Sequence, residues 1–184
     1  MQFDEFSMIQ QELFNLYKKF NNGGMIEIMS GYVKKSDHYD LFSISRYFAE
    51  KGDRVKITTD VHFKDPKYKA IFGKLTGTPY ERKCPDLIIN EKFYEYERYI
   101  GQFKKRKLSN MISHGTKQSS RIIINNNKGC SDRFVLANIH NRLSDKNFKN
   151  IIDEIWIYEK GKVRLLYKKE IGNFRSLSFF TSGN

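Results

Sequence analysis

Short runs rich in β-branched and aromatic residues alternate with segments of helical periodicity along most of this chain. Runs of the first kind favour strands, whereas apolar residues three or four positions apart favour a helix. Strands that alternate with helices are typical of an α/β domain. Expected strands lie at 25–29, 55–58, 86–89, 93–99, 121–125, 154–158 and 163–167, and expected helices at 3–20, 37–52, 67–72, 104–118 and 131–143. We therefore expect one α/β domain over residues 1–184, with a mixed central β-sheet flanked by helices.

Length and apolar content limit the class of protein. A chain of 184 residues has the size of one domain, and 39% hydrophobic residues are enough for its core. The longest apolar runs, such as 122–124, are far shorter than the roughly 20 residues of a membrane span. Asp4 and Glu5 replace the basic start of a secretory signal. We expect a soluble cytoplasmic protein with no membrane partner, in which Cys84 and Cys130 are reduced thiols.

The charge of the chain is strongly unbalanced. Lysine and arginine number 33 against 21 aspartates and glutamates, which gives a formal net charge of +12. Such an excess raises the local concentration of polyanions before any specific contact forms. The charge therefore favours nucleic acid, DNA or RNA, as the partner. A basic surface that serves only solubility, or that reflects a lysine-rich proteome, is the alternative.

Three acids lie on the hairpin expected at 86–99. Side chains two positions apart on a strand share a face, so Glu95 and Glu97 point the same way. If Asp86 begins the partner strand, its carboxylate converges with theirs. Carboxylates of this kind bind Mg²⁺ or Mn²⁺ at sites of phosphoryl transfer. The alternative is a solvated strand face that pairs with lysines, although three carboxylates on one face repel one another without a cation.

Pro85-Asp86 followed by Glu95-Tyr96-Glu97 resembles the motif of the PD-(D/E)xK nuclease superfamily. The order of elements over about residues 37–125 resembles the core of that restriction-endonuclease-like fold. Within the superfamily, residues 85–95 and 117–124 look most like the tRNA-cleaving toxin domains at the C-termini of contact-dependent inhibition proteins. The resemblance implies a nuclease that hydrolyses phosphodiester bonds of DNA or RNA, with tRNA as one possible substrate. It also implies Mg²⁺ or Mn²⁺ as cofactor, Asp86 and Glu95 as metal ligands, and catalytic roles for both residues and Glu97.

Glu97 departs from this pattern, because the superfamily usually has lysine at that position. Lysine helps to position or activate the attacking water, and a carboxylate cannot do this by its charge. Some restriction endonucleases of the superfamily carry glutamate there, where it ligates metal or accepts a proton from the water. Two alternatives therefore stay open: a catalytically inactive, basic nucleic-acid-binding protein on the same fold, and a protein that binds an acidic protein partner.

The superfamily often draws a further acid from the helix before the hairpin. Asp40 is the nearest candidate for this metal ligand. Asp37 is explained as the N-cap of the same helix, and Glu50 as an exposed residue at its end.

Residues on the helix after the hairpin are candidates for contact with nucleic acid. Its first turn carries Lys104, Lys105, Arg106 and Lys107. These cations can hold the phosphates that flank the cleaved bond, or they form a solvated helix end. His114 and Gln118 are four positions apart, so they share a face of the expected helix and can contact substrate. A structural role for His114 is the alternative.

Overall fold

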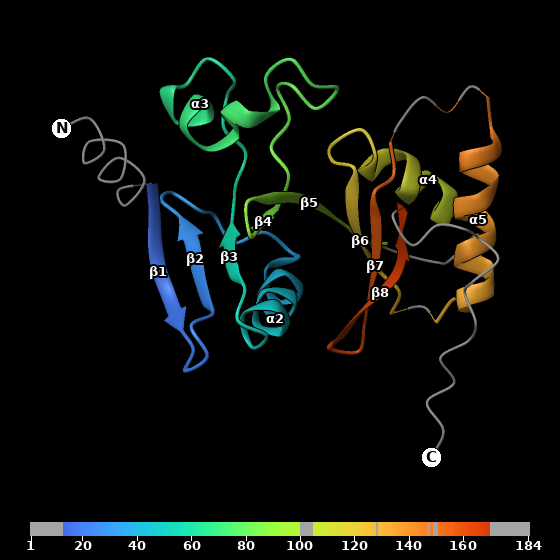
Figure 1. Ribbon diagram of the computed structural model, residues 1–184, viewed down its shortest axis with the longest axis horizontal. Helices are drawn as coiled ribbons and strands as arrows, with labels where there is room; N and C mark the ends of the chain where they lie inside the picture. Colours follow the sequence, from blue (N-terminus) through green and yellow to red (C-terminus); the bar gives the residue numbers. More distant parts are fainter. Residues whose placement is uncertain (1–12, 100–104, 128, 147, 149–150, 170–184) are drawn as a thin grey trace.

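The computed structural model describes residues 13–99, 105–127, 129–146, 148 and 151–169 (Figure 1). The strands are β1 (Phe14–Lys19), β2 (Met25–Met29), β3 (Arg54–Ile57), β4 (Leu87–Ile89), β5 (Lys92–Glu97), β6 (Arg121–Asn125), β7 (Glu154–Glu159) and β8 (Lys162–Lys168). The helices are α2 (His38–Ala49), α3 (Pro66–Phe72), the 3₁₀-helix η1 (Gly73–Leu75), α4 (Lys105–Gly115) and α5 (Asp132–Ser144). No helix among the described residues has both the length and the apolar character needed to cross a lipid bilayer.

The strands form one eight-stranded sheet in which strand order follows chain order, from β1 to β8. β2 pairs with β3, β5 with β6 and β6 with β7 in parallel, and the remaining neighbours are antiparallel. Each parallel pair is joined through a helix, namely α2, α4 and α5, as parallel connections require. The expected α/β class with a mixed sheet is therefore confirmed.

The helices cover both faces of the sheet, and strand alternation decides which residues they meet. Leu87 and Ile123 belong to the cluster under α2, together with Leu41, Ile44 and Phe48 of that helix. Their chain neighbours point to the opposite face, where Ile88 packs with α3 and Ile122 with α4 and α5. Figure 1 shows α2 on one side of the sheet and α4 and α5 beside β6, β7 and β8. Each large aliphatic side chain buried in this way contributes about 1.5–3 kcal/mol.

The prediction of a helix at 3–20 is wrong for residues 14–19. Residues 14–19 form β1, an antiparallel neighbour of β2, and residues 3–12 lie outside the described part of the chain. The helical spacing of apolar residues misled the prediction, because Leu16 and Tyr17 are 61% and 58% exposed instead of buried on a helix face. Pairing with β2 satisfies the backbone of this segment and overrides its local pattern.

Two other expected boundaries differ from the structure. The helix expected at 104–118 ends at Gly115, and residues 116–118 form a turn closed by backbone hydrogen bonds. The strand expected at 93–99 ends at Glu97. The short helix expected at 67–72 is confirmed as α3, capped by the Asp65 carboxylate, which accepts from the backbone N–H of Lys67.

Replacement of Gly24 by alanine is expected to destabilise the fold. A Cβ atom at this position would lie 2.0 Å from the carbonyl oxygen of Ala49, which is backbone at the end of α2. The clash forces β2 and α2 apart, so the free energy of unfolding should fall by about 2–4 kcal/mol. Gly73→Ala is the matched control, because its Cβ would meet only the Lys69 side chain, at 3.8 Å. Urea denaturation should separate the two variants, and equal stabilities would contradict the expectation.

Candidate active site

The β4–β5 hairpin brings the candidate acids together. Its two-residue turn, Asn90-Glu91, has φ values of 45° and 65°, as a type I′ turn requires. The turn sets the register, in which Leu87 lies opposite Tyr94 and Ile88 opposite Phe93. The same register, continued by one residue, places Asp86 opposite Glu95.

Asp86, Glu95 and Glu97 lie on the face of the hairpin that also carries Ile88 and Phe93. Leu87, Tyr94 and Tyr96 alternate with them and pack into the cluster beneath α2. Ile88 and Phe93 belong to the opposite cluster, with α3. The three acids therefore share a face.

Asp86 is a half-buried carboxyl group immediately before β4. Its Oδ2 accepts a hydrogen bond of 3.0 Å from the backbone N–H of Tyr96. Its pKa is raised to about 7, chiefly by burial and also by the charges of Asp37 and Asp60, while the Tyr96 amide and the charge of Lys35 oppose the rise. A neighbouring divalent cation would favour the ionised form of this group and so lower its pKa.

Glu95 is buried, with 9% of its surface exposed. Burial raises its pKa well above the ordinary value for glutamate, and the neighbouring charges of Asp86 and Glu97 add to the rise. Among the described residues, neither Asp86 nor Glu95 forms an ion pair with a basic side chain. Two facing carboxyl groups without such a counter-ion are an arrangement that a cation would stabilise.

Glu97 contacts His114 of α4. Its Oε1 lies 2.5 Å from Nδ1 of His114, and its side chain is 12% exposed while that of His114 is 66% exposed. Burial raises the pKa of Glu97, and the hydrogen bond and charge of His114 oppose the rise. Gly115 permits this close packing, because a Cβ there would lie 3.0 Å from Cγ of Glu97.

Asp40 is directed away from the three acids. Its Oδ2 accepts from the Tyr96 hydroxyl at 2.6 Å and from Nδ2 of Asn125 at 3.1 Å. Nδ2 of Asn125 also donates to the Tyr96 hydroxyl, at 2.7 Å. This network ties α2 to β5 and β6 on the face opposite the acids. Tyr96 connects the two groups, because its backbone N–H binds Asp86.

The charge of Asp37 acts on the candidate acid Asp86, which a capping role alone does not predict. It occupies the N-cap position of α2, as expected, but its side chain makes no capping hydrogen bond. Its buried Oδ1 has no hydrogen-bond partner among the described residues, and its charge raises the pKa of Asp86. Asp37 is therefore a candidate member of the site, and an acid at a helix start was its only signal in the sequence.

Lys35 is a cation near the acids that the sequence did not single out. Its Nζ lies 2.7 Å from Oδ2 of Asp60, and its charge lowers the pKa of Asp86. Lys35 comes from the loop before α2, fifty-one positions before Asp86 in the chain, so no local motif links the two residues.

The expected nucleic-acid contacts have different positions. Lys104 lies outside the described residues, and only the backbone of Lys105 is described. Nζ of Lys107 lies 4.6 Å from the centre of the Tyr99 ring. His114 contacts Glu97 through Nδ1. Gln118 follows the end of α4, so the prediction that it shares a helix face with His114 is wrong, and its buried Oε1 has no partner among the described residues.

The residues present fit a divalent cation held by two carboxylates. Mg²⁺ in phosphoryl-transfer sites is bound by one or two carboxylates, with water and substrate phosphate as the other ligands. Asp86 and Glu95 meet this description through their opposed positions and raised pKa values. No group of three His, Cys, Asp or Glu side chains in the described part of the chain is arranged to hold a metal ion.

Asp86 should make the stability of the metal-free protein depend on pH. Its folded pKa, about 7, is above the ordinary 3.8, so the folded state loses stability as pH rises between these values. Asp86→Asn keeps an acceptor for the Tyr96 N–H and cannot ionise. Between pH 4 and pH 8 in EDTA, the free energy of unfolding of the variant should rise relative to the parent by about 1–3 kcal/mol. Glu50→Gln, on the exposed end of α2, is the control. A difference independent of pH would contradict the raised pKa.

Comparisons with protein-family models, with curated proteins and with solved structures find no match to this chain.

Proposed function

We propose that this protein is a divalent-metal-dependent nuclease of the PD-(D/E)xK type, with a restriction-endonuclease-like core, that hydrolyses phosphodiester bonds of DNA or RNA. The opposed carboxyl groups of Asp86 and Glu95 carry the proposal. They share a face of the β4–β5 hairpin, burial raises both pKa values, and no ion pair with a described basic residue compensates them. Two neighbouring carboxylates repel each other, so a cation bound between them would stabilise the folded protein.

The charge of the chain supports nucleic acid as the substrate. A formal net charge of +12 favours the binding of any polyanion. The scissile phosphate of a nucleic acid is negatively charged, so the two acids would repel it without a cation between them. A bound Mg²⁺ or Mn²⁺ supplies a Lewis acid that neutralises this charge and lowers the pKa of a bound water.

The residues of the chain have separate proposed roles. Asp86 and Glu95 hold the cation, and the Tyr96 backbone N–H orients Asp86 through its hydrogen bond to Oδ2. Glu97 accepts a proton from water and is oriented by His114. Lys35 supplies positive charge near Asp86, which the lysine of the motif supplies in the superfamily.

A catalytically inactive nucleic-acid-binding protein is the second candidate. The observation that favours it is the pairing of Glu97 with His114 at the place where the superfamily has lysine. A carboxylate engaged in this way is not free to ligate metal unless His114 moves. Binding through the basic surface would remain.

Incubation of the purified protein with labelled tRNA, single-stranded RNA and duplex DNA tests the proposal. Cleavage should appear with Mg²⁺ or Mn²⁺ and disappear with EDTA. Affinity measured in EDTA should fall steeply as salt rises, with about one counterion released per phosphate contact. Binding without cleavage under every metal condition would support the second candidate, and an affinity indifferent to salt would contradict both.

A further inference from the structure

A pocket of about 240 Å³ lies beside the candidate acids on the same face of the hairpin. Ile88 and Phe93 form the cross-strand pair next to Asp86 and Glu95, and both line this pocket. Two residues along a strand span about 7 Å. The pocket is therefore about one nucleotide away from the point where a phosphate would meet the acids.

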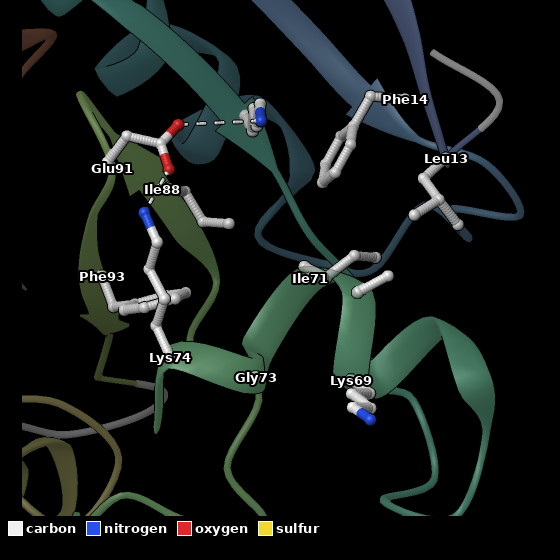
Figure 2. A pocket seen from close by; sticks show the side chains of 11 residues that line it. Leu13, Phe14, Lys69, Ile71, Gly73, Lys74, Ile88, Glu91 and Phe93 are labelled. Carbon is white, nitrogen blue, oxygen red and sulfur yellow. Dashed lines mark hydrogen bonds and ion pairs between the residues drawn. The ribbon is translucent and has the colours of Figure 1, made fainter. Parts of the chain in front are cut away.

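The walls of the pocket are apolar and partly aromatic. Figure 2 shows Phe14 on one side and Phe93 on the other, with Ile71 and Ile88 between them. Drug-sized ligands occupy pockets of about 300–1,000 Å³, so this smaller one suits a single planar ring system. Aromatic walls of this kind stack with nucleobases.

The charged side chains that line the pocket are Glu91 and three lysines, Lys56, Lys69 and Lys74, and two of these lysines pair with Glu91. Oε2 of Glu91 lies 2.8 Å from Nζ of Lys74, and Oε1 of Glu91 lies 3.9 Å from Nζ of Lys56 (Figure 2). The Lys56 side chain is only 7% exposed, and its Nζ lies 4.9 Å from the centre of the Phe14 ring. Lys74 lowers the pKa of Glu91, so this group remains a carboxylate with free lone pairs on both oxygens.

We propose that this pocket binds a guanine base of the substrate, unstacked from its neighbours and adjacent to the scissile phosphate. Guanine presents two adjacent donors, N1–H and the N2 amino group, beside the acceptor O6. The donors match the two oxygens of Glu91, and O6 matches a lysine beside them. Adenine, cytosine and uracil each present one donor on this edge, next to acceptors that a carboxylate repels.

The inference deepens the proposed nuclease function and rests on it for the position of the cleaved bond. A base reaches the pocket only from a single strand, loop or bulge, because a duplex keeps its Watson–Crick edge paired. The preferred substrates are therefore nucleic acids with an unpaired guanine.

Calorimetric titration of the full chain with the four ribonucleoside 5′-monophosphates, in EDTA, tests the pocket without cleavage. Guanosine monophosphate should bind at least about tenfold more tightly than the other three, because a bidentate hydrogen-bonded pair discriminates between bases by about this factor. Glu91→Gln should abolish this preference, because an amide replaces one acceptor oxygen by a donor. Glu50→Gln, at the exposed acid that follows the last residue of α2, is the matched control.

Thermal melting monitors the folding of each variant. Lys74→Gln is the second variant, since its side chain is 67% exposed and it leaves the buried Lys56 in place. It should weaken guanosine monophosphate binding several-fold. Equal binding of the four nucleotides, no binding of guanosine monophosphate at millimolar concentration, or an unchanged preference in folded Glu91→Gln would overturn the inference.

Mapping of cleavage sites on single-stranded RNA separates this inference from the proposed function. Cuts next to guanine that lose their preference in Glu91→Gln support both. Cuts that show no guanine preference overturn the pocket and leave the nuclease intact. Selective binding of guanosine monophosphate without cleavage of any substrate overturns the nuclease and leaves the guanine pocket intact.

Discussion

Asp86→Asn should abolish metal-dependent cleavage, with a loss of at least about 10³-fold in rate. Asparagine keeps the shape of the side chain and an acceptor for the Tyr96 backbone N–H, so the hairpin should remain intact. It removes the charge that Asp86 would provide to a divalent cation opposite Glu95. The measurement is the single-turnover rate on labelled RNA or DNA in Mg²⁺, with binding affinity measured in EDTA.

The control for this prediction lies on the other face of the hairpin. Asp40 binds Tyr96 and Asn125 instead of facing the acids, so Asp40→Asn should reduce the rate by less than about tenfold. Asp37→Asn should have the larger effect of the two, because the charge of Asp37 acts on Asp86. A folded Asp86→Asn variant that still cleaves would exclude the Asp86–Glu95 pair as the metal site. A larger loss from Asp40→Asn than from Asp37→Asn would restore Asp40 as the ligand.

Glu97→Gln should reduce cleavage by at least about 10²-fold if Glu97 accepts the proton of the attacking water. The amide keeps the shape of the side chain but cannot act as a base. Nucleic-acid affinity should hold or rise, because a negative charge that repels phosphate has been removed. Rates and affinities measured on the same substrate separate the two effects.

Glu97→Lys tests the opposite case, a scaffold that lost its catalytic cation. Lysine restores the residue that the motif usually carries, but it meets His114 on α4, so the double variant with His114→Ala removes the competing imidazole. A parent protein that does not cleave, together with a double variant that does, would establish that loss. If neither the parent nor any of these variants cleaves DNA or RNA with Mg²⁺ or Mn²⁺, the nuclease proposal is wrong and a basic binding protein remains.

Local patterns predicted the hairpin that carries the candidate site. Two runs rich in β-branched and aromatic residues, separated by the polar residues 90–92, predicted β4 and β5, and a side-chain period of two then fixes which residues share a face. The positions of Asp86, Glu95 and Glu97 relative to one another therefore needed little beyond the sequence. The same local information placed α2, α3 and α5 and the strands from β2 to β8 to within a few residues.

Where the local pattern and the tertiary environment disagree, the tertiary environment decides. Residues 14–19 have helical spacing, but the edge of β2 offers backbone partners, and the segment forms β1 with Leu16 and Tyr17 exposed. Helix α4 ends at Gly115, where the chain turns to place residues 119 and 120 before β6. The segment 14–19 carries no signal of its own for a strand, whereas Gly115 is a residue type at which helices commonly end.

The sequence by itself determined the α/β class, the order of most elements and the shared face of three acids, because these depend on neighbours a few residues apart. The tertiary structure alone decided which distant groups meet them. It turned Asp40 toward Tyr96, left Asp37 without a cap hydrogen bond, and paired Glu97 with His114. It also brought Lys56, Lys74 and Glu91 around one pocket. These contacts depend on sheet register, on the face that each helix covers and on burial, and such quantities are set by the whole fold.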